Sequence, residues 1–159
     1  MLNENLTPRD TPIAIGEPAP NFILPDQDRN DVSLSSLLAP GGDVVLSFYP
    51  LDFSPVCSNE MGCFTRDIDR FRDKNATVVG ISCDSFYAHK AWSDTLGLTI
   101  RLLADMHRRV CKAYGFYFAP LNVASRGTVV IAPDGRVKWV SARELKDAID
   151  NETLLKAIS

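Results

Sequence analysis

The stretch Tyr49-Pro50-Leu51-Asp52-Phe53-Ser54-Pro55-Val56-Cys57-Ser58-Asn59-Glu60 separates two different sequence patterns. Residues 44–48 before it read Val-Val-Leu-Ser-Phe, a short apolar run typical of a buried strand. Beyond it, apolar residues recur at intervals of three and four, the spacing of one helix face: Cys57, Met61, Phe64, Ile68 and Phe71. The patterns predict a strand, a proline-bounded loop and a helix over about 57–73, with Cys57 where the loop becomes the helix.

A cysteine in the first turn of a helix is well placed to react as a thiolate. The first N–H groups of a helix lack intrahelical partners, and the macrodipole adds partial positive charge, so both favour a thiolate over a thiol. The helix terminus contributes about 0.3–1 kcal/mol. One guanidinium about 4 Å away contributes about 4 kcal/mol at an effective dielectric constant of about 20. We therefore expect an arginine from elsewhere in the chain to lie beside Cys57.

Strand and helix patterns alternate along the rest of the chain. Gly16, Pro18 and Pro20 interrupt the apolar residues of 13–24, which indicates extended segments, and a turn follows at 25–28. The remaining patterns predict a short helix at 32–38, strands at 77–83 and 98–103, helices at 86–97 and 106–114, a hairpin of strands 128–132 and 136–140, and a last helix at 144–158.

This alternation predicts an α/β fold with a mixed sheet and helices on both of its faces. The late hairpin adds antiparallel strands at one side of the sheet. Cys57 then lies at the carboxyl end of a strand, where open α/β sheets place their active sites. Residues 1–12 are polar and are expected to form a flexible N-terminal tail, and residues 13–159 a single domain.

Composition excludes several classes of function. The chain has 159 residues and a formal net charge of −3. Acidic and basic residues are mixed, so neither nucleic acid nor a membrane surface is an expected partner. No apolar run approaches the roughly 18 residues of a membrane span, and no signal peptide is evident, so a cytoplasmic location is expected. In a reducing compartment the four cysteines are expected to be catalytic, redox-sensing or core residues: Cys57, Cys63, Cys83 and Cys111.

The motif Pro50-x-x-x-Ser54-x-x-Cys57, with Glu60 three residues later, resembles the peroxidatic motif of the peroxiredoxins, thioredoxin-fold enzymes that reduce hydroperoxides. The resemblance extends over nearly the whole chain from residue 13, through segments 16–22, 79–92 and 125–128. It is closest to the Q-type (bacterioferritin comigratory protein) and alkyl hydroperoxide reductase E types. The resemblance implies a thioredoxin-like mixed β-sheet flanked by helices on both faces.

The resemblance also implies a role for each residue of the motif. Cys57 thiolate would attack the distal oxygen of a hydroperoxide and become a sulfenic acid. Arg126 would be the expected cation, would stabilise the thiolate and would hydrogen-bond the peroxide oxygens. Ser54 would hold the peroxide in line, Pro50 would shield the thiolate from water, and Glu60 would orient Arg126. Many family members have threonine where this chain has Ser54, so a slower rate is expected.

Several thiols are candidates to react with the Cys57 sulfenic acid and so resolve it. Cys63 is the first, but it lies six residues after Cys57, about 9 Å along an intact helix, beyond the reach of a disulfide. Gly62 would make unwinding of this helix easier. Cys111 and Cys83 are alternatives, each expected more often to be a core thiol. Resolution by an external thiol, from thioredoxin or another reductant, is an alternative of equal standing.

No cofactor and no metal are expected, because His89 and His107 fall on separate predicted helices. A thioredoxin-like disulfide oxidoreductase would need Cys-x-x-Cys, and residue 60 is glutamate. A redox sensor or chaperone that uses Cys57 without efficient turnover is the alternative class. The expected partners are a hydroperoxide and a thiol reductant, and the expected state is a monomer or small homodimer.

Overall fold

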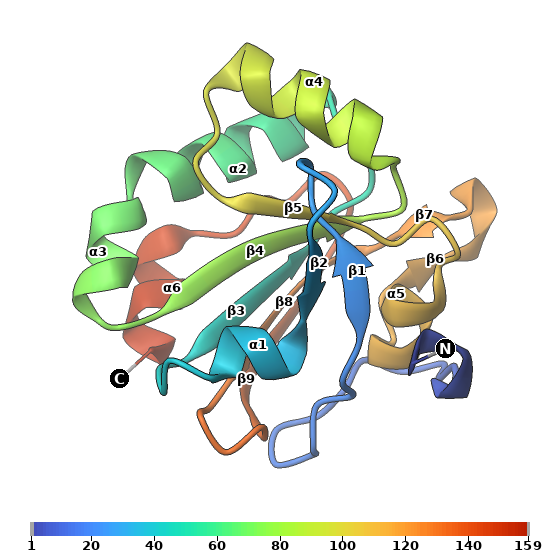
Figure 1. The fold of residues 1–159 in the computed structure, drawn as a ribbon, viewed down its shortest axis with the longest axis vertical. Coiled ribbons are helices and arrows are strands. Elements are labelled where there is room, and N and C mark those ends of the chain that lie inside the picture. Colours follow the sequence, from blue (N-terminus) through green and yellow to red (C-terminus); the bar gives the residue numbers. More distant parts are fainter. Residues whose placement is uncertain (1, 159) are drawn as a thin grey trace.

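The computed structural model describes residues 2–158, in which a five-stranded sheet forms the centre (Figure 1). Its strands lie in the order β5-β4-β3-β8-β9. The first three are parallel to one another, whereas β8 runs antiparallel to β3 and β9 antiparallel to β8. The bounds are β3 (Val44–Phe48), β4 (Thr77–Ser82), β5 (Arg101–Ala104), β8 (Arg126–Ile131) and β9 (Val137–Arg143). The predicted mixed α/β sheet is confirmed.

Helices cover both faces of this sheet and enclose two apolar layers (Figure 1). One layer lies beneath α2 (Pro55–Arg66), α3 (Ile68–Asp73), α4 (Phe86–Leu96) and α6 (Asn151–Ala157). The other lies beneath α1 (Leu34–Leu38) and α5 (Arg109–Tyr114). We call these the α2 layer and the α5 layer. Because side chains alternate along a strand, Val45 of β3 enters the α2 layer while Val44 and Leu46 enter the α5 layer.

Smaller elements complete the fold. β1 (Ile23–Pro25) pairs with β2 (Asp31–Ser33), and β6 (Tyr117–Phe118) pairs with β7 (Val123–Ala124). Two short 3-10 helices are η1 (Leu2–Asn5) and η2 (Ala119–Leu121). The β6–β7 pair has strands of only two residues, too short for a periodic pattern, and the sequence did not predict it.

Several predicted elements have different bounds. The helix expected over 32–38 begins only at Leu34, because residues 31–33 form the strand β2. The hairpin strands expected at 128–132 and 136–140 span 126–131 and 137–143. The helix expected over 57–73 is divided at Asp67, whose carboxylate accepts a hydrogen bond from Asn151 Nδ2 at 3.0 Å. The last helix begins at Asn151 rather than 144, because the backbone groups of Leu145 and Ile149 bond to buried side chains instead. The predicted elements 98–103 and 106–114 also start later, as β5 and α5.

The N-terminal segment makes specific contacts with the rest of the domain. Asn3 exchanges two hydrogen bonds with the backbone of Ile23, at 2.6 and 3.0 Å. The N–H of Arg9 donates to the carbonyl of Lys112 in α5, and Leu6 packs against the α5 layer. Asn3 and Arg9 therefore anchor this segment to the domain, and the flexibility of residues 1–12 stays a prediction.

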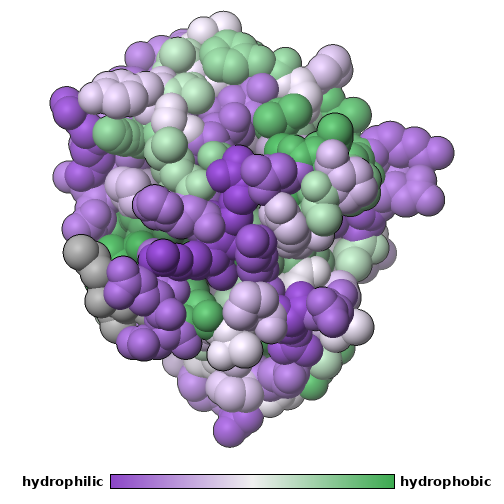
Figure 2. All heavy atoms as spheres, turned by 90° about the vertical axis from the view of Figure 1, so that its right-hand side faces the viewer, coloured by the Kyte–Doolittle hydropathy of each residue, from purple (hydrophilic) through white to green (hydrophobic). Residues whose placement is uncertain are grey.

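Figure 2 shows the side of the molecule on which the N-terminal segment and α5 lie. Hydrophilic side chains cover most of this face, and hydrophobic ones form separate small groups. Within residues 2–158, no helix combines the length and the apolar character that crossing a membrane requires.

Two glycines that end helices provide a test of the N-terminal anchor. Gly97 and Gly115 both adopt positive φ, +64° and +78°. A Cβ at Gly97 would meet nothing within 4 Å, whereas one at Gly115 would lie 2.1 Å from the carbonyl oxygen of Thr11. Gly97→Ala should therefore lose only the cost of the left-handed conformation, about 1–2 kcal/mol of unfolding free energy. Gly115→Ala should lose about 1–3 kcal/mol more through the clash. Denaturant unfolding of both variants measures the difference, and equal losses would contradict the packing of residues 11–12 on α5.

Candidate functional site

Cys57 lies in the first turn of α2, at the carboxyl end of β3. Ser54 is the N-cap residue and Pro55 occupies the first turn, where its missing N–H costs nothing. The Ser54 hydroxyl accepts a hydrogen bond from the N–H of Cys57 at 3.4 Å. Cys57 is fully buried at the edge of the α2 layer. The local sequence thus places the thiol at the positive end of a helix dipole.

Arg126, the first residue of β8, contacts the Cys57 sulfur. Its Nη2 donates to Cys57 Sγ at 2.9 Å, and its Nη1 donates to Glu60 Oε1 at 3.1 Å. Its Nε donates to the carbonyl of Leu145 at 2.9 Å. The side chain is 1% exposed, so these bonds replace the water that it loses. The structure therefore supplies the cation that a stable Cys57 thiolate requires.

Glu60 is one helical turn beyond Cys57 and holds two guanidinium groups. Besides Arg126, it accepts hydrogen bonds from Arg143 Nη2 at 3.1 Å and from the N–H of Ile149 at 2.8 Å. The carboxylate is fully buried, with both oxygens occupied. Burial lowers the pKa of Arg143, and the adjacent Glu60 carboxylate opposes that effect. Glu60 thus fixes the position of Arg126 relative to the thiol.

Arg143 was absent from the site that the sequence predicted. It pairs directly opposite Arg126 in the β8–β9 register. Two neighbouring arginines, one fully and one largely buried, are stabilised by a shared anion. The information was in the register of the hairpin, and the predicted second strand ended at residue 140, before Arg143.

The loop that leads to Cys57 is anchored by a second buried network. Asp52 Oδ2 lies 2.7 Å from His89 Nδ1, and the Tyr49 hydroxyl donates to Asp52 Oδ1 at 2.7 Å. His89 Nε2 faces the carbonyl of Leu103 at 3.1 Å. His89 therefore secures the loop from α4. Pro50 is buried in this loop.

The other cysteines occupy different surroundings. All four are free thiols. Cys63 is partly exposed on α2, with its sulfur 3.9 Å from Asn59 Oδ1. Cys83 and Cys111 lie in the α5 layer, across the sheet from Cys57, with their sulfurs 3.8 Å apart. The structure therefore brings together Cys57, Ser54, Glu60 and Arg126, and separates Cys83 and Cys111 from them.

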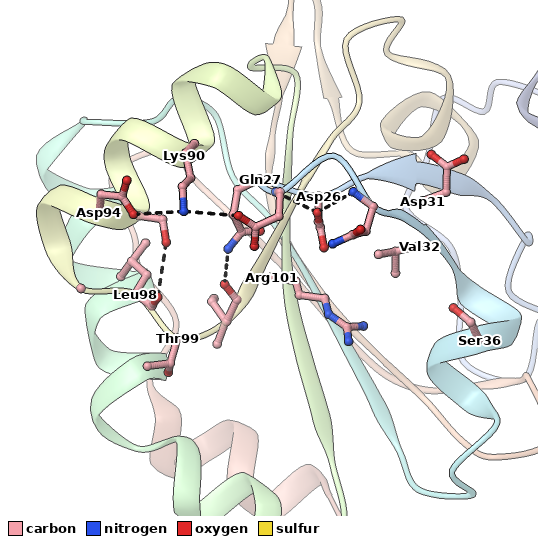
Figure 3. Close-up of a pocket in the computed structure, with 15 residues that line it drawn as sticks. Asp26, Gln27, Asp31, Val32, Ser36, Lys90, Asp94, Leu98, Thr99 and Arg101 are labelled. Atoms are coloured by element: carbon pink, nitrogen blue, oxygen red, sulfur yellow. Dashed lines mark hydrogen bonds and ion pairs between the residues drawn. The ribbon is translucent and has the colours of Figure 1, made fainter.

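A surface hollow of about 910 Å³ lies away from this site (Figure 3). Two of its acidic groups are paired, since Lys90 bridges Asp28 and Asp94. Gln27 bonds to the backbone of Ile100 and Leu102 along the edge of β5. No residue of the Cys57 site lines this hollow, so its size is not connected with the thiol chemistry.

Glu60→Gln should destabilise the protein by about 3–5 kcal/mol, because it leaves the buried Arg126 guanidinium and the largely buried Arg143 guanidinium without their anion. Glu152→Gln is the control, since Glu152 pairs with Arg70 on the exposed surface and its loss should change the unfolding free energy little. Denaturant unfolding at neutral pH compares the two variants. A Glu60→Gln variant as stable as the control would show that the buried pairs do not hold the site.

The chain is similar to known proteins over most of its length. The AhpC/TSA family model matches residues 15–140. The mitochondrial thioredoxin-dependent peroxide reductase of Rattus norvegicus is 34% identical over 142 residues, which cover 83% of this chain and 54% of that protein. Peroxiredoxin-1 of Gallus gallus is 34% identical over 142 residues, covering 82% of this chain and 70% of that protein. This chain therefore spans about half the length of the rat relative.

The fold comparison agrees with the sequence comparison. The crystal structure of peroxidoxin BcpB from Mycobacterium tuberculosis matches with a TM-score of 0.83 and 28% identity, over 91% of this chain and 96% of that one. The peroxiredoxin resemblance of the Cys57 motif is confirmed, and the match to BcpB is consistent with the Q type. Since the family model covers most of its length, this chain belongs to the AhpC/TSA family, the family of the peroxiredoxins.

Proposed function

We propose that this protein is a thiol-dependent peroxidase that reduces hydrogen peroxide and organic hydroperoxides through a Cys57 sulfenic acid. The observation that carries the proposal is the 2.9 Å contact between Arg126 Nη2 and Cys57 Sγ. This contact is buried and Glu60 fixes it, so the guanidinium can act on the sulfur with little screening by water. The names of the relatives support the same reaction.

In the proposed reaction, the Cys57 thiolate attacks the distal oxygen of ROOH. The S–O bond forms as the O–O bond breaks, and the leaving alkoxide takes a proton and departs as ROH. The sulfur is oxidised to a sulfenic acid and the peroxide is reduced by the same electron pair. Arg126 stabilises the negative charge that grows on the peroxide oxygens. The Ser54 hydroxyl, beside the Cys57 N–H, orients the peroxide.

We infer that an external thiol, rather than a second cysteine of the chain, reduces the sulfenic acid. Cys83 and Cys111 lie on the far side of the sheet. Cys63 shares the intact helix α2 with Cys57, about 9 Å farther along it and on a different face. A thioredoxin or another thiol in a reducing cytoplasm fits this requirement, as the name of the rat relative suggests. A monomer or small homodimer stays our prediction for the assembly.

Substitutions at Cys57 and Arg126 test the reaction. Cys57→Ser should remove the fast phase of peroxide consumption, and Arg126→Lys should lower kcat/KM by about 10²–10³, because the lysine cannot contact both Cys57 and Glu60. Arg72→Lys is the control, since Arg72 is exposed on α3 and pairs only with Asp69. Peroxide consumption with dithiothreitol as reductant is the measurement. Consumption by Cys57→Ser at the rate of the unaltered protein would exclude the mechanism.

The fate of the sulfenic acid is tested with one equivalent of hydrogen peroxide. The reduced protein is oxidised in the presence of a 1,3-diketone that traps sulfenic acids, and its peptides are mapped without reduction. The adduct should be on Cys57, with Cys63 a free thiol. A disulfide between Cys57 and Cys63 would show that α2 unwinds, and would replace the external thiol with a resolving cysteine. A protein that is oxidised but does not turn over with any thiol would instead be a redox sensor.

A further inference from the structure

Two cysteines that play no part in the Cys57 site lie in contact with each other. Cys83 follows the last residue of β4, and Cys111 lies in α5. Their sulfurs are 3.8 Å apart although the residues are separated by 28 positions in the sequence. Both belong to the α5 layer, whereas Cys57 belongs to the α2 layer. The central sheet therefore separates two thiol sites.

We propose that Cys83 and Cys111 form a second redox site, a dithiol that a hydroperoxide oxidises to an intramolecular disulfide independently of Cys57. Cys83 is the thiol that meets the oxidant, and Cys111 closes the disulfide. The proposal does not rest on the peroxidase function, because the Cys57 sulfur takes no part in it.

The backbone holds the two sulfurs together through Asp105. The N–H of Asp105 donates to the carbonyl of Ser82 at the end of β4, at 2.8 Å. Its carboxylate accepts the N–H groups of Val110 and Cys111, at 3.2 and 2.8 Å. Asp105 thus ties the end of the strand to the start of the helix. A disulfide has an S–S bond of about 2.05 Å, so each sulfur needs to move by less than about 1 Å from the observed 3.8 Å separation.

The two thiols are not equivalent. Cys83 is 9% exposed and Cys111 is completely buried, so an oxidant reaches Cys83 first. The hydrogen bond between the two sulfurs lowers the pKa of Cys83, as do the charge of Arg108 and the N–H of Ala124, whereas burial and the Asp105 carboxylate oppose the shift. The same sulfur–sulfur hydrogen bond, together with burial, raises the pKa of Cys111. The two shifts have opposite directions, so Cys83 is the sulfur that more readily reacts as a thiolate and Cys111 is the one that more readily keeps its proton.

One molecule of hydroperoxide is enough to oxidise the Cys83–Cys111 dithiol to a disulfide. The Cys83 thiolate attacks the distal oxygen, the O–O bond breaks, and ROH leaves with a proton from water, giving a Cys83 sulfenic acid. The Cys111 sulfur then attacks the Cys83 sulfur, the S–O bond breaks, and the departing hydroxide leaves as water with the Cys111 proton. Asp105 lies within 4.8 Å of both sulfurs. Because burial raises the pKa of Asp105, its carboxylate is a suitable base to pass on that proton.

The same three side chains could in principle hold a thiophilic metal ion, but their surroundings favour the redox pair. A structural zinc ion takes four ligands and needs both thiols deprotonated. Within residues 2–158 only Cys83, Asp105 and Cys111 gather here. The Asp105 carboxylate already accepts two backbone N–H groups, and Cys111 retains its proton.

The test uses a Cys57→Ser, Cys63→Ser double variant, in which Cys83 and Cys111 are the remaining cysteines. The reduced, desalted protein is titrated with hydrogen peroxide, denatured in a thiol-blocking reagent and mapped by mass spectrometry without reduction. We expect about one equivalent of peroxide to convert both thiols into a Cys83–Cys111 disulfide within the monomer, reversed by dithiothreitol. Two free thiols in folded protein after excess peroxide, or disulfides only between molecules, would overturn the proposal.

Single replacements in this background test the order of the steps. With Cys111→Ser, a 1,3-diketone should trap a sulfenic acid on Cys83. With Cys83→Ser, Cys111 should stay reduced over the same time, since it is buried and protonated. Circular dichroism confirms that each variant is folded, and Cys111→Ala replaces Cys111→Ser if the serine prevents folding. Equal reaction of Cys111 in the absence of Cys83 would overturn the assigned order.

Two further measurements separate this site from its alternatives. In the chain with Cys57 intact, Cys83→Ser should leave peroxide turnover unchanged, so the two proposals succeed or fail separately. The double variant is also incubated with one equivalent of Zn²⁺ and desalted. Stoichiometric zinc that stays bound and prevents oxidation would identify a metal site and overturn the redox assignment, whereas a desalted protein free of zinc supports it.

Discussion

The charge balance around Glu60 controls the chemistry of this structure. One buried carboxylate faces the buried guanidinium of Arg126 and the largely buried guanidinium of Arg143. With Cys57 as a neutral thiol, these three groups would carry one uncompensated positive charge. A thiolate at Cys57 restores neutrality and accepts the remaining Arg126 donor at 2.9 Å. Because an unpaired buried charge is costly, the cluster itself favours the reactive form of the sulfur.

The same cluster explains an irregular part of the fold. Residues 144–150 have a composition compatible with a helix, yet they are not helical. Their backbone is used by the site, since the carbonyl of Leu145 accepts from Arg126 and the N–H of Ile149 donates to Glu60. These bonds satisfy polar groups that have no other partner at this depth. The helix α6 therefore starts only at Asn151, after the cap supplied by Asp150.

What the sequence predicted, and what it did not, depends on the distance between interacting residues. One loop and the helix turn after it contain Ser54, Cys57 and Glu60, so the local spacing was enough to predict that these residues lie together. Arg126 lies 69 positions from Cys57 and was identified from the electrostatic requirement together with the family motif.

Arg143, by contrast, could be identified only from the register of β8 with β9, because its partner Glu60 is distant in the sequence. The contact of His89 with Asp52 was missed for the same reason: 37 positions separate them, and neither residue lies in a periodic pattern that predicts it.

The alternation of side chains along β4 between the two faces of the sheet explains how one sheet can carry two separate thiol sites. Val79, Ile81 and Cys83 point into the α5 layer, whereas Val78 and the Cα of Gly80 face the α2 layer. Cys57 lies beside a guanidinium that contacts its sulfur directly. Cys83 has only a neighbouring thiol, a backbone N–H and a more distant arginine, with the Asp105 carboxylate opposing them. The first environment suits fast attack on a peroxide. The second suits slower oxidation of Cys83 followed by disulfide formation, because the Cys111 sulfur is already in contact.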